Sequence, residues 1–374
     1  MLKLRFPLPV FRNANEIANG KNARMALKGL VANRVALIIS PSFRKSKFFE
    51  QVVRLVNATS VRVIEKSWKG EPTVDELSGV VGELESFQPD YIVALGGGSI
   101  IDGAKLAWLL YECPTIDPDV LFRPFAIPPL RGRAKFAAIP TTVGAGSEVS
   151  SAAVMLDSAT QSKKAVVTHD FLPDLVILDP DLVSEVPLSI LRTTVADALS
   201  HAIEGYVSKI PHPLMETFAE QAVSIVYRYQ SQLDQDEWHI DMLSELQHAA
   251  MLAGWVQNHC VVGLSHAIAH QLGHFNVGHG LANGLLMPAV IEFNSQDQVV
   301  EQKYERLIKN AGLPSRQALL DLFKGLTSGQ GVSLNLSNEQ LDNIAKNALL
   351  DPAAATNPVA FAEDDVKEIV KKCL

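Results

Sequence analysis

Two pairs of metal-ligand residue types stand at helical spacing in the second half of the chain. Asp197 and His201 lie four residues apart, as do His266 and His270, and His279 follows nine residues after His270. Residues at i and i+4 share one face of a helix, so each pair can direct its side chains to one point. One carboxylate with several imidazoles suits a divalent transition metal better than calcium or magnesium, which prefer oxygen ligands. The spacing therefore predicts a transition-metal site.

Two histidines on one helix face also occur in zinc hydrolases, where a glutamate beside the first histidine serves as the base. Here the segment from His266 to His270 reads HAIAH, and the glutamate is missing. A metal-dependent hydrolase is therefore only a distant alternative. His274 continues the four-residue spacing, and we interpret it as a pocket wall or a buried polar group rather than a ligand.

A glycine-rich segment, GGGSIIDGAK, follows the apolar run YIVAL. Gly96, Gly97 and Gly98 have no side chains to keep a phosphate away from the backbone N–H groups. Ser99 and Asp102 fit a capping box, which predicts that a helix begins at this loop and turns its positive end toward the ligand. The segment is neither GxGxxG nor a Walker loop, so a strand-to-helix connection without a ligand is the alternative.

A second segment, FAAIPTTVGAGSE, carries Thr141, Thr142 and Ser147 after another apolar run. These small hydroxyl residues can line a cofactor groove, although a polar loop without a ligand would have the same composition. A metal site and a nucleotide site in one chain together predict a redox enzyme. A nucleotide-binding module without catalytic activity would not need the metal ligands.

The elements that must position these residues divide the chain into two parts. Short runs rich in Val and Ile alternate with helical segments in the first half, which is typical of parallel strands buried on both faces of an α/β sheet. These runs are VALIIS, VRVIE, YIVAL, FAAIP and DLVIL. From Pro187 onward the long patterns are helical, as in SILRTTVADALSHAIEGYV. We predict an α/β dinucleotide-binding domain with a parallel sheet over residues 1–186 and an all-α metal-binding domain over residues 187–374.

The bulk properties exclude several other classes of protein. The 374 residues carry a formal charge of −8, which argues against nucleic acid or an anionic membrane surface as the main partner. No apolar run reaches the roughly 18 residues of a membrane span. The N-terminal stretch MLKLRFPLPVFRN is interrupted by Arg5, Pro7 and Pro9, so it lacks a signal-peptide apolar segment. Three scattered cysteines do not make a disulfide framework, and we expect a cytoplasmic protein.

Taken together, the motifs resemble those of the iron-dependent (group III) alcohol dehydrogenase family over nearly the whole chain. Seven segments occur in the family's order: GGGSIIDGAK, IPTTVGAGSE, PDLVILDP, ADALSHAIEGYVS, SHAIAHQLGH, GHGLANGLLMP and the TNP stretch that begins at Thr356. The resemblance implies a metal between the two domains, a homodimer, and interconversion of a small alcohol and its aldehyde or ketone by hydride transfer with a nicotinamide cofactor.

The resemblance also implies roles for single residues. Asp197, His201, His266 and His279 match the family's iron ligands, and His270 matches an additional active-site histidine that could relay a proton. The residues that match the cofactor groove of relatives are Gly97, Gly98, Ser99, Asp102, Thr141, Thr142, Ser147 and Lys163. We expect ferrous iron (Fe2+), although Zn2+ or another divalent metal could occupy the site in purified protein. A glycerol-dehydrogenase-like or dehydroquinate-synthase-like zinc enzyme is the alternative, but zinc sites there resemble one Asp and two His.

Cofactor choice is predicted from the position after the strand VALIIS. Relatives that prefer NAD often carry an acid there, which hydrogen-bonds the ribose 2′-OH and repels a 2′-phosphate. This chain has Pro41 between Ser40 and Ser42, three cations at residues 44–47, and no carboxylate before Glu50. We therefore expect NADP(H), with Ser40 and Ser42 at the 2′-phosphate and aldehyde reduction as the working direction. NAD(H) is the alternative, in which the cations only form a solvated helix face.

Overall fold

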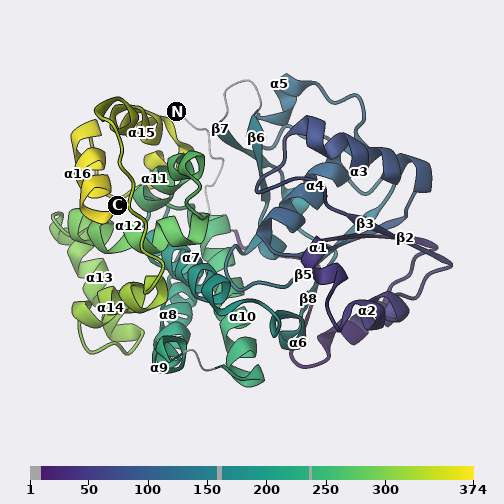
Figure 1. The fold of residues 1–374 in the computed structure, drawn as a ribbon, viewed down its shortest axis with the longest axis horizontal. Coiled ribbons are helices and arrows are strands. Elements are labelled where there is room, and N and C mark those ends of the chain that lie inside the picture. The colour runs from purple at the N-terminus through teal and green to yellow at the C-terminus, as the bar shows by residue number, and fades with distance from the viewer. Residues whose placement is uncertain (1–9, 158–161, 236–237) are drawn as a thin grey trace.

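The computed structural model describes residues 10–157, 162–235 and 238–374, which form two bodies of secondary structure (Figure 1). Strands and their covering helices occupy one half, and the other half contains only helices among the described residues. The prediction that no signal peptide is present rested on the N-terminal stretch. Residues 1–9 of that stretch lie outside the described residues.

The first half is built on a six-stranded sheet whose strands run parallel, in the order β1-β8-β5-β4-β2-β3. The central strands are buried almost throughout because helices cover both faces of the sheet. All five apolar runs form strands, so the predicted α/β fold with a parallel sheet is confirmed. The strands are β1 (Glu16–Asn19), β2 (Arg34–Ile39), β3 (Ser60–Glu65), β4 (Tyr91–Gly96), β5 (Lys135–Pro140) and β8 (Leu175–Leu178).

The strand order changes direction between β2 and β4. After β2 the chain moves outward to β3, and then it returns to β4 and continues on the other side to β5. In open α/β sheets, ligands bind at such a point, beyond the carboxyl ends of the strands. Ser40 follows β2 directly and the glycine-rich segment follows β4, so both predicted cofactor segments lie at this edge of the sheet.

Helices and one antiparallel pair of strands complete the first half. The α-helices are α1 (Pro41–Arg44), α2 (Phe49–Leu55), α3 (Val74–Phe87), α4 (Gly98–Glu112), α5 (Pro118–Leu121) and α6 (Pro180–Val183). The 3-10 helices are η1 (Ala23–Gly29), η2 (Ser147–Val149) and η3 (His169–Phe171). The antiparallel strands β6 (Ala152–Asp157) and β7 (Ser162–Val167) were not predicted, and β7 begins with Ser162 and two lysines instead of an apolar run.

The predicted capping box at the glycine-rich segment is wrong. α4 begins at Gly98, with Gly97 as an N-cap in extended conformation and no side-chain cap. Asp102 is instead buried, and its Oδ2 accepts a hydrogen bond from the backbone N–H of Val154 on β6 at 3.0 Å. Glycine backbone enters the helix without a capping side chain, which leaves the first turn of α4 accessible to an anionic ligand.

The second half is helical, as predicted, and none of the described helices is both long and apolar enough to span a membrane. Its first helix is buried over most of its length because other helices surround it. The α-helices are α7 (Leu188–Val207), α8 (Pro213–Arg228), α9 (Gln230–Asp234), α10 (Ile240–Cys260), α11 (Leu264–Leu272), α12 (His279–Asn294), α13 (Gln298–Asn310), α14 (Arg316–Thr327), α15 (Asn338–Leu350) and α16 (Glu363–Cys373). The 3-10 helices are η4 (Gly273–Phe275) and η5 (Pro352–Thr356).

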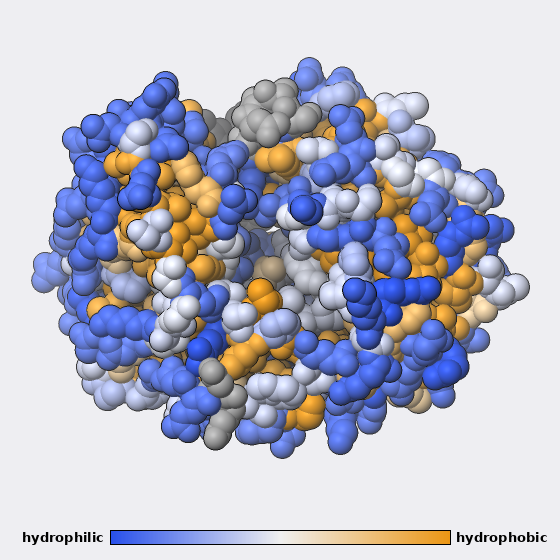
Figure 2. Space-filling view, viewed as in Figure 1, coloured by the Kyte–Doolittle hydropathy of each residue, from blue (hydrophilic) through white to orange (hydrophobic). Residues whose placement is uncertain are grey.

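The two halves face each other across a hollow that Figure 2 shows at the centre of the molecule, and they touch backbone to backbone. A Cβ atom added to Gly146, before η2, would lie 2.5 Å from the Cα of Gly254 on α10. A Cβ atom on Gly254 would in turn lie 2.8 Å from the Cα of Gly146. Gly146 also has φ of +64°, which a residue with a side chain rarely adopts. Side chains are therefore excluded from this contact on both sides.

The contact predicts that Gly254→Ala destabilises the protein. The added methyl group would overlap main-chain atoms, and overpacking of this kind costs about 1–3 kcal/mol. Gly79→Ala is the matched control, because Gly79 lies inside α3 with nothing within 4 Å of an added Cβ. That change should stabilise by about 0.4–1 kcal/mol. Thermal melting of both variants checks the prediction, and equal melting temperatures would contradict it.

Candidate metal centre and cofactor groove

Four side chains from three helices converge on one point in the second half. Asp197 and His201 come from α7, His266 from α11 and His279 from the start of α12. Their candidate ligand atoms all lie within 4.8 Å of one another. Asp197 Oδ1 is 4.0, 3.7 and 3.5 Å from the Nε2 atoms of His201, His266 and His279. The structure thus brings together all four residues that were predicted as metal ligands.

Burial sets the charges of this cluster. It lowers the pKa of His201 to about 4 and the pKa values of His266 and His279 to about 3, so the three imidazoles are neutral at pH 7. Burial alone would raise the pKa of Asp197, but the neighbouring histidines and a hydrogen bond from Asn283 bring it down to about 2. One carboxylate anion therefore faces three neutral imidazoles, which is the protonation state that metal binding requires.

The cluster fits a divalent transition-metal ion. The Nε2 of His266 is buried and has no hydrogen-bond partner among the described residues. A buried polar atom without a partner costs free energy, which a ligand at that atom would recover. Three imidazole nitrogens and one carboxylate oxygen, directed at one point, are the donor set that such a metal prefers.

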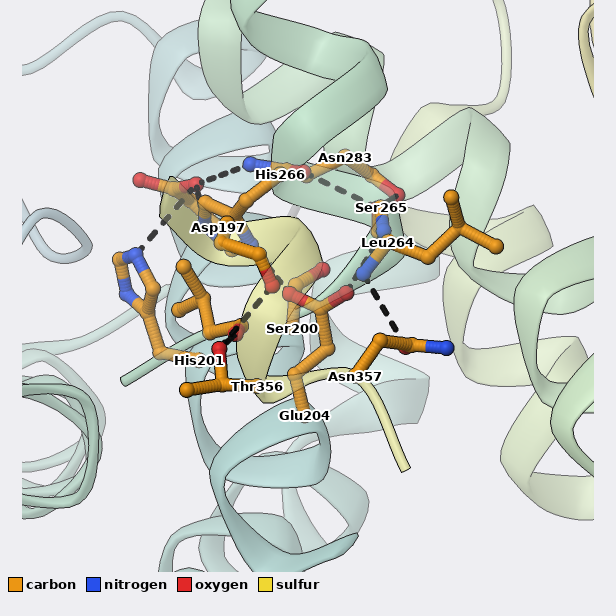
Figure 3. A network of polar contacts seen from close by, with 12 residues as sticks. Asp197, Ser200, His201, Glu204, Leu264, Ser265, His266, Asn283, Thr356 and Asn357 are labelled. Carbon is orange, nitrogen blue, oxygen red and sulfur yellow. Dashed lines mark hydrogen bonds and ion pairs between the residues drawn. The ribbon is translucent and has the colours of Figure 1, made fainter. Parts of the chain in front are cut away.

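Glu204 on α7 orients His266. Its Oε2 lies 2.5 Å from the Nδ1 of His266, and its Oε1 accepts a hydrogen bond from the backbone N–H of Ser265 at 2.7 Å (Figure 3). A carboxylate on one ring nitrogen holds the proton there and leaves Nε2 free to bind a metal. Glu204 was not predicted as part of the site, although its spacing of three residues from His201 places both on one helix face.

Further polar contacts fix the other members of the cluster. The amide Nδ2 of Asn283, on α12, donates to Asp197 Oδ1 at 2.9 Å, and its Oδ1 accepts from Ser265 Oγ at 3.0 Å. Asn357, in the TNP stretch, accepts a hydrogen bond from the backbone N–H of Leu264 at 3.1 Å (Figure 3). The TNP stretch therefore holds the first turn of α11, the helix that carries His266.

His270 lies beside the cluster but is not one of its four members. Its ring stacks on His279 with centroids 5.4 Å apart, and its Nδ1 is 2.8 Å from Asp351 Oδ2. Asp351, at the start of η5, was not found from the sequence, because 81 residues separate it from His270 and no motif marks it. His274 is exposed on η4, so its interpretation as a buried polar group is wrong.

The glycine-rich segment packs against the second predicted cofactor segment. A Cβ atom on Gly97 would lie 3.2 Å from Thr142 Oγ1, and one on Gly98 would lie 2.6 Å from Ala145 Cβ and 3.3 Å from Ser147 Oγ. Only glycines allow this approach, which forms a cradle at the first turn of α4. The structure therefore brings Gly97, Gly98, Thr142 and Ser147 together, and these residues fit a bound phosphate.

A buried lysine links the two segments that form this cradle. Lys105 on α4 is fully buried, and its ammonium donates to the carbonyl oxygens of Ser147 and Ser150 at 2.6 and 2.7 Å. Thr141 joins the cradle through its backbone N–H, which donates to the carbonyl of Gly96 at 3.0 Å. The segment after β5 is thus tied to the helix whose N-terminus faces the groove.

Lys163 and Asp102, which were also predicted in the groove, have partners within the protein. Lys163 Nζ forms an ion pair with Glu71 Oε1 at 2.7 Å, and a Cβ atom on Gly273 would lie 3.4 Å from its Cε. Burial would raise the pKa of Glu71, but the charge and hydrogen bond of Lys163 bring it below its usual value. Lys163 thus reaches from β7 toward the helical half, whereas the Asp102 carboxylate turns toward β6.

Ser40 and Ser42 lie together at the end of β2. The Ser40 hydroxyl caps α1 by accepting from the backbone N–H of Phe43 at 3.1 Å, and it is 2.9 Å from the Ser42 hydroxyl. Sheet pairing places Glu65, the last residue of β3, beside Ile39. This carboxylate near the predicted 2′-phosphate position was missed, because only the pairing of two strands reveals it.

The cations that follow Ser42 are partly engaged with carboxylates. Arg44 pairs with Glu65 at 3.5 Å, and Lys47 lies 4.0 Å from Glu185. Their charges are therefore compensated within the protein, and less of the positive charge predicted from the sequence is available to a ligand.

A parallel sheet with a glycine-rich cradle at one edge, together with a largely buried cluster of one aspartate and three histidines, is typical of a metal-dependent oxidoreductase with a dinucleotide cofactor. The chain belongs to the iron-containing alcohol dehydrogenase family. Residues 14–180 match the model of the iron-containing alcohol dehydrogenases, and residues 192–374 match the C-terminal model of the Fe-containing alcohol dehydrogenase family. The predicted resemblance is confirmed, and the chain is an oxidoreductase that interconverts alcohols and carbonyl compounds with NAD(P).

Individual relatives agree with this family over almost their full length. The chain is 30% identical to an alcohol dehydrogenase of Thermococcus barophilus, with 91% of this chain and 92% of that protein covered. It is 29% identical to the NADPH-dependent butanol dehydrogenase of Clostridium saccharobutylicum, with 98% and 97% covered. The structure of the iron-containing alcohol dehydrogenase from Thermococcus thioreducens matches with a TM-score of 0.87 and 28% identity, with 98% and 99% covered.

The contact between Glu204 and His266 predicts that Glu204→Gln weakens metal binding. Loss of a carboxylate that orients a ligand typically lowers metal affinity 10- to 100-fold. Ser200→Ala is the matched control, since Ser200 is buried one turn away on α7 and its hydroxyl only donates to the carbonyl of Ala196. Competition with a chelator, followed by elemental analysis, measures the difference. Equal metal retention in both variants would show that Glu204 does not orient His266.

Proposed function

We propose that Asp197, His201, His266 and His279 hold the metal ion of an alcohol dehydrogenase, and that ferrous iron is the native ion. The observation that carries this proposal is the convergence of one carboxylate and three imidazoles within 4.8 Å. Zinc, nickel or cobalt would satisfy the same donors in purified protein. The third histidine favours iron over a zinc enzyme of the glycerol-dehydrogenase or dehydroquinate-synthase type.

Each bound group supplies its own part of the chemistry. A divalent ion, when bound, supplies Lewis-acid polarisation of an alcohol or carbonyl oxygen. The nicotinamide ring, when bound, supplies the hydride chemistry. The chain's own residues position these groups, because Glu204 fixes the ring of His266 and the cradle of Gly97 and Gly98 receives the cofactor phosphates.

We assign the proton relay to His270. Its Nδ1 is held against Asp351 at 2.8 Å, which leaves the other ring nitrogen to take up or return the proton of the substrate hydroxyl. The side chain is partly exposed, so a proton can pass from it to solvent. Stacking on His279 keeps the ring beside the four ligands.

We further propose NADP(H) as the preferred cofactor, small primary alcohols and their aldehydes as substrates, and reduction of the aldehyde as the working direction. Ser40, Pro41 and Ser42 leave the end of β2 without a carboxylate of its own. The NADPH-dependent butanol dehydrogenase named above supports the cofactor and the substrate class, and a 1-propanol dehydrogenase of Citrobacter freundii, 29% identical, supports the substrate class. The remaining groove residues, Ser99, Asp102, Thr141, Thr142, Ser147 and Lys163, complete the proposed cofactor site.

The organisation of the molecule is part of the proposal. We place the dinucleotide-binding domain at residues 1–186 and the metal-binding domain at residues 187–374, since the last strand of the sheet ends at Leu178 and α7 begins at Leu188. A cytoplasmic location agrees with three free cysteines. A homodimer is proposed on family resemblance alone.

The metal assignment predicts that His266→Ala abolishes most of the activity and most of the metal content. Loss of this ligand weakens binding of the divalent ion, which is the counter-charge of the buried Asp197 carboxylate. His274→Ala is the matched control, because His274 lies eight residues further along, is exposed and is outside the cluster. Elemental analysis and aldehyde reduction by iron-reconstituted protein are the measurements. Full metal content and activity in His266→Ala would refute the assignment.

The cofactor assignment predicts that kcat/KM is higher with NADPH than with NADH. Pro41→Asp should shift this ratio toward NADH by about tenfold or more, because the new carboxylate repels a 2′-phosphate and accepts from a 2′-OH. Pro118→Asp, an exposed proline in the first turn of α5, is the control and should leave the ratio unchanged. Steady-state kinetics with both cofactors decides the matter. A wild-type preference for NADH would overturn the assignment.

A further inference from the structure

Lys66 places an ammonium group between the two segments of the cofactor groove. Its backbone N–H donates to the carbonyl of Ile39 at 3.0 Å, one residue before Ser40. Its Nζ donates to the hydroxyl of Ser99 at 2.9 Å, in the first turn of α4. The residue follows β3 directly, so the sheet brings it to the same edge as the ends of β2 and β4.

A buried tryptophan fixes the segment that carries Lys66. Trp68 Nε1 donates to the carbonyl of Ser99 at 3.2 Å, and its ring fills the space that a side chain at Gly103 would need, with a built Cβ only 2.2 Å from Cζ2. Trp68 is buried against α4. The position of Lys66 is therefore set before any ligand arrives, which lowers the entropic cost of binding.

Lys66 has no ion pair with a carboxylate among the described residues, although Glu71 and Glu76 favour its charged form from a greater distance. Among the described residues, Arg44, Lys47 and Lys163 each lie within 4.0 Å of a carboxylate, whereas Lys66 has no such ion pair. Burial lowers the pKa of Lys66, so an anion beside the ammonium would stabilise its charged form. The first turn of α4, which carries no side-chain cap, offers partial positive charge at the same place.

We propose that Lys66 binds a phosphate group of the nicotinamide cofactor. This inference rests on the proposed function and adds a cofactor contact to it. Two phosphates offer the same chemistry: the pyrophosphate, which binds at helix N-termini of this kind, and the 2′-phosphate of NADP(H), which would lie near Ser40. This role was not predicted, since Lys66 belongs to no motif and only the pairing of β3 with β2 brings it to the groove.

Equilibrium binding of NADPH and NADH to the metal-loaded enzyme, followed by nucleotide fluorescence without substrate, tests the proposal. Lys66→Met removes the charge and should weaken cofactor binding about tenfold or more, as expected for the loss of a charge-assisted hydrogen bond. Lys66→Arg keeps the charge and should retain most of the affinity. Lys69→Met, which removes an exposed lysine three residues away, is the matched control and should bind as the wild type does. Lys66→Gln serves as a second neutral variant, and thermal melting verifies that each variant is folded.

The pattern of losses identifies the phosphate. Equal weakening for NADPH and NADH supports contact with the pyrophosphate, and weakening for NADPH alone supports contact with the 2′-phosphate. Unchanged affinity for both cofactors in folded Lys66→Met and Lys66→Gln would overturn the inference while leaving the proposed function intact. A loss that Lys66→Arg does not restore would also overturn it. Failure of the wild-type enzyme to bind either cofactor would instead overturn the proposed function itself.

Discussion

Placing one carboxylate and three imidazoles together in a largely buried position costs free energy, and hydrogen bonds within and between α7, α11 and α12 offset part of that cost. Asp197 carries a charge in a buried position, so it depends on the hydrogen bond from Asn283 and on the neighbouring imidazoles. His266 presents a bare Nε2 to the cluster because Glu204 occupies the opposite side of its ring. Helices α7, α11 and α12 are each locked to this cluster by at least one such contact, so the fold of this half and its chemistry depend on the same few hydrogen bonds.

The α/β half solves a different problem, because its ligand is large, anionic and exchangeable. Here the site depends on the absence of side chains, because Gly97 and Gly98 leave the first turn of α4 open to a phosphate. Lys105 on α4 holds this part of the groove in place, because its ammonium donates a hydrogen bond to the carbonyl oxygen of Ser147. The metal site is thus formed by converging side chains, whereas the proposed phosphate site is formed by main-chain N–H groups on a segment that Lys105 holds in place.

The sequence identified those parts of the site that depend on local spacing. The i, i+4 pairs on α7 and α11 and the apolar strand runs are local patterns, and the structure contains the helices and strands that they predicted. Glu204 could have been predicted from the same helical spacing, because it lies three residues after His201. The role of Asp351, the position of Glu65 beside Ile39 and that of Lys66 arise from long-range packing or strand pairing, which no local pattern records. The predicted capping box failed for a related reason, because the Asp102 carboxylate found a partner on β6, which is distant in sequence.

The main-chain contact between Gly146 and Gly254 limits how the two halves can move relative to each other. Two backbones in van der Waals contact leave no rotamer change that could bring the halves closer at this place. A movement that pushed the two halves together at this place would be opposed by main-chain atoms, whereas a rotation about the glycine pair would keep them in contact. Gly146 immediately precedes Ser147 in the cofactor cradle, and α10 packs against α7, which carries Asp197. The glycine contact thus joins the loop of the cofactor cradle to α10, which packs against the helix of the ligands Asp197 and His201, so a side chain inserted at this place would disturb both sites.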